Sequence, residues 1–92
     1  MKYVTVNQQD NGGTFCMGIF SNYKTAIGDV MDHIWDFQTS YQDEGDTFEI
    51  SAPYTLEGGG GTGIKVTFKA AIWESACSEY YYILDVEDKN CQ

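Results

Sequence analysis

The chain has 92 residues, in which fourteen acidic residues face five lysines and no arginine, giving a formal net charge of −9. This length fits a single domain over residues 1–92, and an aromatic content of 15% supplies bulk for a core, which argues against intrinsic disorder. A negative field of this size repels nucleic acid and anionic lipid and attracts basic surfaces, so we expect neither nucleic acid nor a membrane as a direct partner.

The first part of the chain predicts a β-hairpin followed by a helix. Residues 2–8 and 14–20 alternate as strands do, around the strong turn sequence Asp-Asn-Gly-Gly. Ser21 or Asn22 is a suitable helix N-cap, and apolar residues then recur at helical spacing. We expect the helix to end near residue 40, before a polar loop.

The rest of the sequence predicts strands at residues 47–52, 64–73 and 79–86, with a glycine-rich loop at 57–63. The connections between these strands are short enough for antiparallel pairing. The order β-β-α-β-β-β therefore predicts an α+β fold in which one helix packs on one face of an antiparallel sheet.

The alternation in the last predicted strand assigns its two faces. The side chains expected to face the core are Tyr80, Tyr82, Leu84 and Val86. Trp73, Tyr81 and Ile83 then form an exposed apolar strip, which a second layer, a partner or a second copy of the chain would cover.

Cysteine usage and the absence of targeting signals indicate a soluble cytoplasmic protein. Cys16, Cys77 and Cys91 are odd in number, widely spaced and without a Cys-x-x-Cys pair, so we expect free thiols. A disulfide between two of them is the alternative. No stretch approaches the roughly 18–20 apolar residues of a membrane span, and no apolar segment near the start resembles a signal peptide.

Motifs that carry chemistry are weak in this sequence. The glycines that formally match Gly-x-Gly-x-x-Gly are Gly58, Gly60 and Gly63. A dinucleotide site requires a helix after this motif, and here a strand is predicted instead. His33 lies one helical turn from both Asp29 and Asp36, but side chains on one convex helix face cannot easily wrap an ion. We therefore expect no enzyme activity, no cofactor and no metal.

Acidic residues form three groups that we assign as partner-binding residues. They are Asp29, Asp32 and Asp36 on the helix, Asp43, Glu44 and Asp46 in the following loop, and Asp85, Glu87 and Asp88 near the C-terminus. Lys65 and Lys69, on the neighbouring predicted strand, are expected to neutralise part of the last group. The helix and loop groups therefore weigh more in the assignment.

The helix acids lie where they lower helix stability. Asp32 and Asp36 occupy the C-terminal half, where negative charge opposes the helix dipole, and only Lys24 is basic on this helix. These costs are a few tenths of a kcal/mol for each acid, and Gly28 adds roughly 1 kcal/mol relative to alanine. A helix that accepts them indicates selection for its surface.

The opening pattern of the chain resembles a group of small acidic proteins from phages and mobile elements, some anti-CRISPR inhibitors among them. The resemblance covers residues 1–38: a strand, a glycine-rich turn, a second strand ending Gly18-Ile19-Phe20-Ser21, and a helix. It implies a protein that occupies the basic groove of a nucleic-acid-binding effector, as a DNA mimic or a steric plug, in the bacterial cytoplasm.

The sequence therefore predicts a non-enzymatic inhibitor of a basic nucleic-acid-binding bacterial effector, foremost a CRISPR-Cas complex. Its carboxylates would take the places of phosphates against lysine and arginine of the target. The alternative is a structural module that self-associates, as a homodimer, through its exposed aromatic sheet face.

Overall fold

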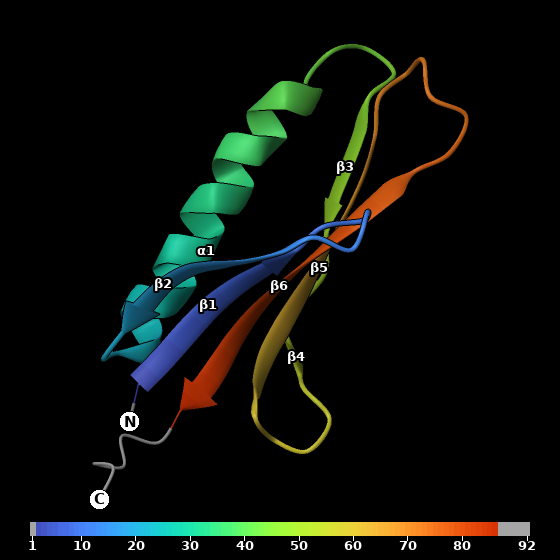
Figure 1. Cartoon of the computed structure of the whole chain (residues 1–92). Coiled ribbons are helices and arrows are strands. Elements are labelled where there is room, and N and C mark those ends of the chain that lie inside the picture. The colour runs from blue at the N-terminus through green and yellow to red at the C-terminus, as the bar shows by residue number, and fades with distance from the viewer. Residues whose placement is uncertain (1, 87–92) are drawn as a thin grey trace, which may run out of the picture.

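Figure 1 shows the computed structural model of the chain, which describes residues 2–86. One helix lies across one face of a six-stranded antiparallel sheet, so the predicted α+β fold is confirmed. The elements are β1 (Lys2–Gln8), β2 (Thr14–Phe20), α1 (Tyr23–Gln38), the 3-10 turn η1 (Thr39–Tyr41), β3 (Thr47–Ile50), β4 (Tyr54–Thr55), β5 (Gly61–Lys69) and β6 (Cys77–Val86). The two-residue strand β4 was not predicted.

The strands follow the order β2-β1-β6-β5-β3, and β4 pairs with β5 beside β3. The last strand, β6, therefore lies between β1 and β5 and joins the N-terminal hairpin to the rest of the sheet. A register shift in β2, opposite Thr5 and Val6, leaves Met17 without a partner residue in β1. Such a bulge bends the strand and redirects its side chains.

The core lies between α1 and the strands β5 and β6. Asn22 is the N-cap of α1, and its side-chain oxygen accepts hydrogen bonds from the backbone N–H groups of Lys24, at 2.8 Å, and Thr25, at 3.3 Å. The buried apolar side chains are Ala26, Val30, Ile34, Ile64, Val66, Phe68, Tyr81 and Ile83. These residues fix the side of α1 that faces the sheet, and thereby the side that faces solvent.

The predicted faces of the last strand are wrong. Tyr81 and Ile83 are 5% and 1% exposed beneath α1, whereas Tyr80 and Tyr82 lie on the other face of the sheet. The register that pairs Tyr81 with the buried Ile64 determines this orientation. Alternation separates two sets of residues in this strand, but both sets are apolar, so the pattern alone does not tell which set lies under the helix.

The predicted strand at 64–73 is displaced toward the N-terminus. Strand β5 begins at Gly61, inside the predicted loop, and ends at Lys69. A turn follows, in which the backbone N–H of Trp73 donates to the Ala70 oxygen at 3.0 Å and Ile72 is 90% exposed. Trp73 is half-buried in this turn and packs on the Phe68 ring, so it does not belong to an exposed strip.

The uncovered face of the sheet carries tyrosine and lysine. The rings of Tyr80 and Tyr82 stack with centroids 6.2 Å apart, and the Lys65 ammonium lies 5.9 Å from the Tyr80 centroid. The Tyr54 ring covers Gly63, where a Cβ would lie within 2.5–2.7 Å of the ring. This face, which we call the open sheet face, is therefore partly apolar and locally basic.

Two of the three cysteines that were predicted to be free thiols lie within the described residues. Cys16, exposed on β2, and Cys77, half-buried on β6, are free thiols, and Cys91 lies outside the described residues. Within residues 2–86, no helix combines the length and hydropathy that crossing a membrane requires.

Candidate functional site

The structure separates the predicted partner-binding acids by their exposure. The exposed ones are Asp32, Asp36, Asp43, Glu44 and Asp85. Asp29 and Asp46 are half-buried, and Glu87 and Asp88 lie outside the described residues. Exposure decides which carboxylates a partner can reach, so the exposed acids and the half-buried acids have to be considered separately.

Asp46 is engaged within the fold. Its Oδ1 accepts a hydrogen bond from the backbone N–H of Ala71 at 2.9 Å, and its Oδ2 accepts one from Asp43 N–H at 3.2 Å. The bond from Ala71 joins the loop after α1 to the turn after β5, and the bond from Asp43 closes a turn within the loop, so both oxygens of this carboxylate are engaged. We therefore place Asp46 outside the surface available to a partner.

Asp29 lies at the edge of α1, one turn before His33. Its Oδ2 is shielded from solvent and has no hydrogen-bond partner among the described residues. Leaving a carboxylate oxygen in this state lowers the stability of the fold, because water no longer solvates it. Asp29 is thus a carboxylate at the margin of the helix, and it is not part of the fully exposed surface.

Trp35 is the functional candidate that the sequence reasoning missed. It is 68% exposed on the outer side of α1, next to Asp36 and one turn after Met31, which is itself 40% exposed. The sequence did contain a sign of this site: Trp35 is a large aromatic residue that does not belong to the apolar residues at helical spacing, and Asp32 and Asp36 flank it in the sequence. Exposed tryptophan is uncommon on free surfaces and is enriched where proteins contact partners.

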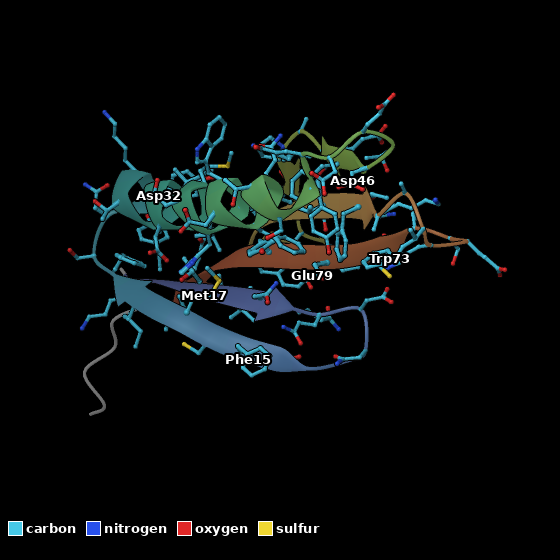
Figure 2. The ribbon with its side chains drawn as sticks, turned by 90° about the horizontal axis from the view of Figure 1, so that it is seen from above. Phe15, Met17, Asp32, Asp46, Trp73 and Glu79 are labelled. Atoms are coloured by element: carbon cyan, nitrogen blue, oxygen red, sulfur yellow. The ribbon has the colours of Figure 1, made fainter. Side chains whose placement is uncertain are left out.

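We call the surface formed by Asp32, Trp35, Asp36, Asp43 and Glu44 the acidic helix face. Figure 2 shows Asp32 on α1 and Asp46 in the loop beyond the C-terminal end of the helix; Asp43 and Glu44 belong to the same loop, so this surface continues from the C-terminal half of α1 into that loop. The last turn of α1 contains no basic residue. No neighbouring cation there compensates the negative charge of this surface, and the negative C-terminal end of the helix dipole adds to it.

Asp85 does not extend this surface. It lies near the end of β6, beside the start of β1, whereas Asp43 and Glu44 follow the opposite end of α1 (Figure 1). The predicted neutralisation by Lys65 and Lys69 is wrong for Asp85, while Glu87 and Asp88 lie outside the described residues. The register pairs Lys65 with Tyr80 and directs both to the open sheet face, whereas Asp85 lies on the helix side, opposite Tyr3.

A cavity of about 380 Å³ opens between α1 and the β1–β2 hairpin. Its apolar lining comes from Phe15, Met17, Phe37 and Tyr81, and its polar lining includes Asn7, Gln9, His33 and Glu79. In Figure 2 the labelled Phe15 and Met17 lie on β2 and Glu79 lies on β6. The bulge in β2 explains the approach of Met17, because the unpaired residue changes the direction of its neighbours.

Glu79 is the acidic group of this cavity. Among the described residues, its carboxylate accepts a hydrogen bond from Asn7 Nδ2 at 3.3 Å. Burial, with a contribution from the Glu79 charge, raises the pKa of Tyr81 to about 12. Burial also raises the pKa of Tyr41, with smaller contributions from Cys77, Glu79 and Asp46. These tyrosines therefore stay neutral next to the negative charge.

The arrangement offers little to a metal or a dinucleotide. Residues 2–86 contain no group of three or more His, Cys, Asp or Glu side chains placed to hold a metal ion. The glycines of the formal dinucleotide motif precede and enter strand β5, so the helix that would hold a pyrophosphate does not follow them.

Comparisons with protein-family models, with curated proteins and with solved structures found no match to this chain. The fold places it among α+β domains with a single helix on an antiparallel sheet. Because such a fold hosts many activities, function has to be argued from the surfaces.

Proposed function

We propose that the protein is a non-enzymatic inhibitor that binds a basic, nucleic-acid-binding bacterial protein through the acidic helix face. The observation that carries this proposal is Trp35, 68% exposed on the outer side of α1, where Asp32 and Asp36 are also exposed. A solvated helix surface has no use for this combination, whereas a surface that docks on a basic groove uses both charge and an aromatic anchor.

The carboxylates act as substitutes for phosphates. Asp32 and Asp36 are one helical turn apart, about 6 Å along the axis, and Asp43 and Glu44 continue the acidic run beyond the helix end. Lysine and arginine side chains that hold a nucleic-acid backbone pair with such carboxylates through charge-assisted hydrogen bonds. Bound protein then excludes the nucleic acid, and the long-range attraction makes association fast and sensitive to salt.

A CRISPR effector complex is the first target to test, because the resemblance of residues 1–38 suggests that class. This target would place the protein in the bacterial cytoplasm. The experiment measures DNA binding by purified CRISPR effectors while the protein is added at about 50 mM and 500 mM salt. We expect DNA to be displaced at low salt and displacement to weaken strongly at high salt. Equal displacement at both salt concentrations, or none with any effector, contradicts the proposal.

A second candidate function is self-association through the open sheet face. It is favoured by the stacked pair Tyr80 and Tyr82 and by Ile19, which is 64% exposed on the same face. A sheet face with this composition is usually covered, and a second copy is the occupant that this proposal names. Light scattering tests it: Tyr82→Glu should convert a dimer to a monomer, whereas Lys24→Glu, on the helix, should not. A wild-type monomer at high concentration contradicts this function.

A further inference from the structure

The cavity between α1 and the hairpin joins three elements that are distant in the sequence. Met17 comes from the bulged strand β2, Phe37 from the last turns of α1, and Tyr81 from β6. Their apolar surfaces meet at a volume of about 380 Å³, near the lower end of the range for ligand sites. The room suits one side chain presented by a partner better than a large free ligand.

Among the polar groups that line the cavity, Glu79 carries the negative charge. Glu79 provides a carboxylate that accepts one described hydrogen bond, from Asn7, and Gln9 adds an amide oxygen. His33 lies on the helix side of the opening, and Asp29, whose Oδ2 has no partner, lies one turn away on the same helix edge. The cavity therefore has the Glu79 carboxylate beside aromatic rings, and a second carboxylate, that of Asp29, lies outside its lining on the same helix edge.

These properties select among ligands. An anion is repelled by Glu79 and Asp29, and a purely apolar group covers the Glu79 carboxylate without offering it a donor, which is unfavourable. A lysine supplies a point charge with a large hydration shell. An arginine supplies a flat cation that stacks on aromatic faces and donates several hydrogen bonds in one plane.

We propose that this cavity receives an arginine side chain of the partner, with its guanidinium against the Glu79 carboxylate and its methylene stem along Met17 and Phe37. The proposal rests on the proposed function in one respect, because it takes the partner to be a basic protein. It adds a recognition site for a single side chain to the contacts made by the acidic helix face.

The methionine methyl groups provide a direct test. Met17 lines the cavity, whereas Met31 is 40% exposed on the outer side of α1, so the two methyl signals report the cavity and the acidic helix face separately. The experiment follows these signals by NMR as N-acetyl-arginine methylamide is added, with the citrulline analogue as a neutral control of the same shape. We expect arginine to shift the Met17 signal saturably and more than the Met31 signal, and citrulline to shift neither.

Matched variants identify the carboxylate. Glu79→Gln keeps an acceptor for Asn7 and should weaken the Met17 response about tenfold, the loss expected when a charge-assisted hydrogen bond becomes neutral. Glu49→Gln, exposed on β3, removes the same charge elsewhere and should leave the response unchanged.

The outcomes separate this proposal from the proposed function. A shift of Met31 without Met17 overturns the arginine site but is compatible with the acidic helix face as the binding surface. Equal shifts with arginine and citrulline, or an unaltered response in Glu79→Gln, also overturn it. If arginine binds as expected but no effector loses DNA, the proposed function fails and the cavity remains an arginine site.

Discussion

Acids of similar sequence context have opposite roles in two neighbouring regions of this molecule. On the outer side of α1, Asp32 and Asp36 extend into solvent, and no described hydrogen bond involves their carboxylates. In the loop after the helix, both carboxylate oxygens of Asp46 accept backbone hydrogen bonds and hold two turns together. The first pair leaves its charge available to a partner, and the second acid uses its charge within the fold.

The contrast shows that negative charge alone does not define a binding surface. A carboxylate whose lone pairs are satisfied by backbone N–H groups offers little to a lysine or arginine of a partner. Counting acids over residues 29–46 therefore overstates the surface, and hydrogen bonding and exposure decide which of them remain.

The largest expected effect is a loss of stability at high pH that depends on the buried Tyr81 hydroxyl. Because burial and Glu79 raise the pKa of Tyr81 to about 12, from about 10 in the unfolded chain, the folded state retains its proton over that interval. Stability is unaffected by Tyr81 below pH 10 and falls as pH rises from 10 to 12, by up to about 3 kcal/mol. Urea unfolding of wild type and Tyr81→Phe at several pH values measures this, and the variant should lose less stability over the interval. Parallel curves would contradict it.

Substitution of the engaged acid should have the next largest effect. Asp46→Asn keeps one acceptor oxygen but loses a charge-assisted bond to Ala71 or Asp43, so we expect a loss of about 1–3 kcal/mol in the free energy of unfolding. Asp43→Asn in the same loop is the matched control and should change stability by less than about 0.5 kcal/mol. Equal losses in the two variants would remove the distinction between engaged and available acids.

Gly28 tests whether the outer side of α1 is open. Nothing lies within 4 Å of a Cβ added at this position, so Gly28→Ala should raise stability by about 1 kcal/mol through helix propensity. Thermal unfolding of the isolated protein measures the gain. Unchanged or reduced stability would mean that another group already occupies this side, which would contradict the free surface assigned to it.

The smallest effect belongs to the available acids themselves. Asp36→Asn removes a negative charge from the unfavourable end of the helix dipole and should raise stability by a few tenths of a kcal/mol. The gain should shrink in 1 M salt, because the Debye length falls to about 3 Å. Denaturation at two salt concentrations measures both. A loss of stability would show that Asp36 is engaged within the fold, as Asp46 is.

The sequence was sufficient to predict the fold class and most of the elements. The strong turn in the hairpin, the N-cap before α1 and the helical spacing of its apolar residues are local signals, and the structure follows them closely. The faces of β6 were not predictable in the same way. Tyr81 and Tyr82 are equally apolar, and only pairing with Ile64 of a strand distant in the sequence decides which is buried.

The candidate site was predicted in part. Acids at 32, 36, 43 and 44 were identified from charge, and they are exposed. The engagement of Asp46 depends on Ala71, 25 positions away, which no local pattern encodes. Trp35 was missed because the helix was analysed by the spacing of its apolar residues, and a residue outside that spacing was taken as ordinary surface. The cavity depends on the bulge at Met17, and a one-residue register shift has no clear signature in a single sequence.

The measurement that tests the central claim most directly compares two charge-matched double variants in the DNA-displacement assay at low salt. One carries Asp32→Asn and Asp36→Asn on the acidic helix face; the other carries Glu49→Gln and Glu57→Gln, which are exposed elsewhere. Both remove two negative charges, so a nonspecific effect of net charge would weaken them equally. We predict that the first variant requires about tenfold more protein to displace DNA and that the second stays within about twofold of wild type. Equal weakening, or none in the first variant, would contradict the acidic helix face as the binding surface.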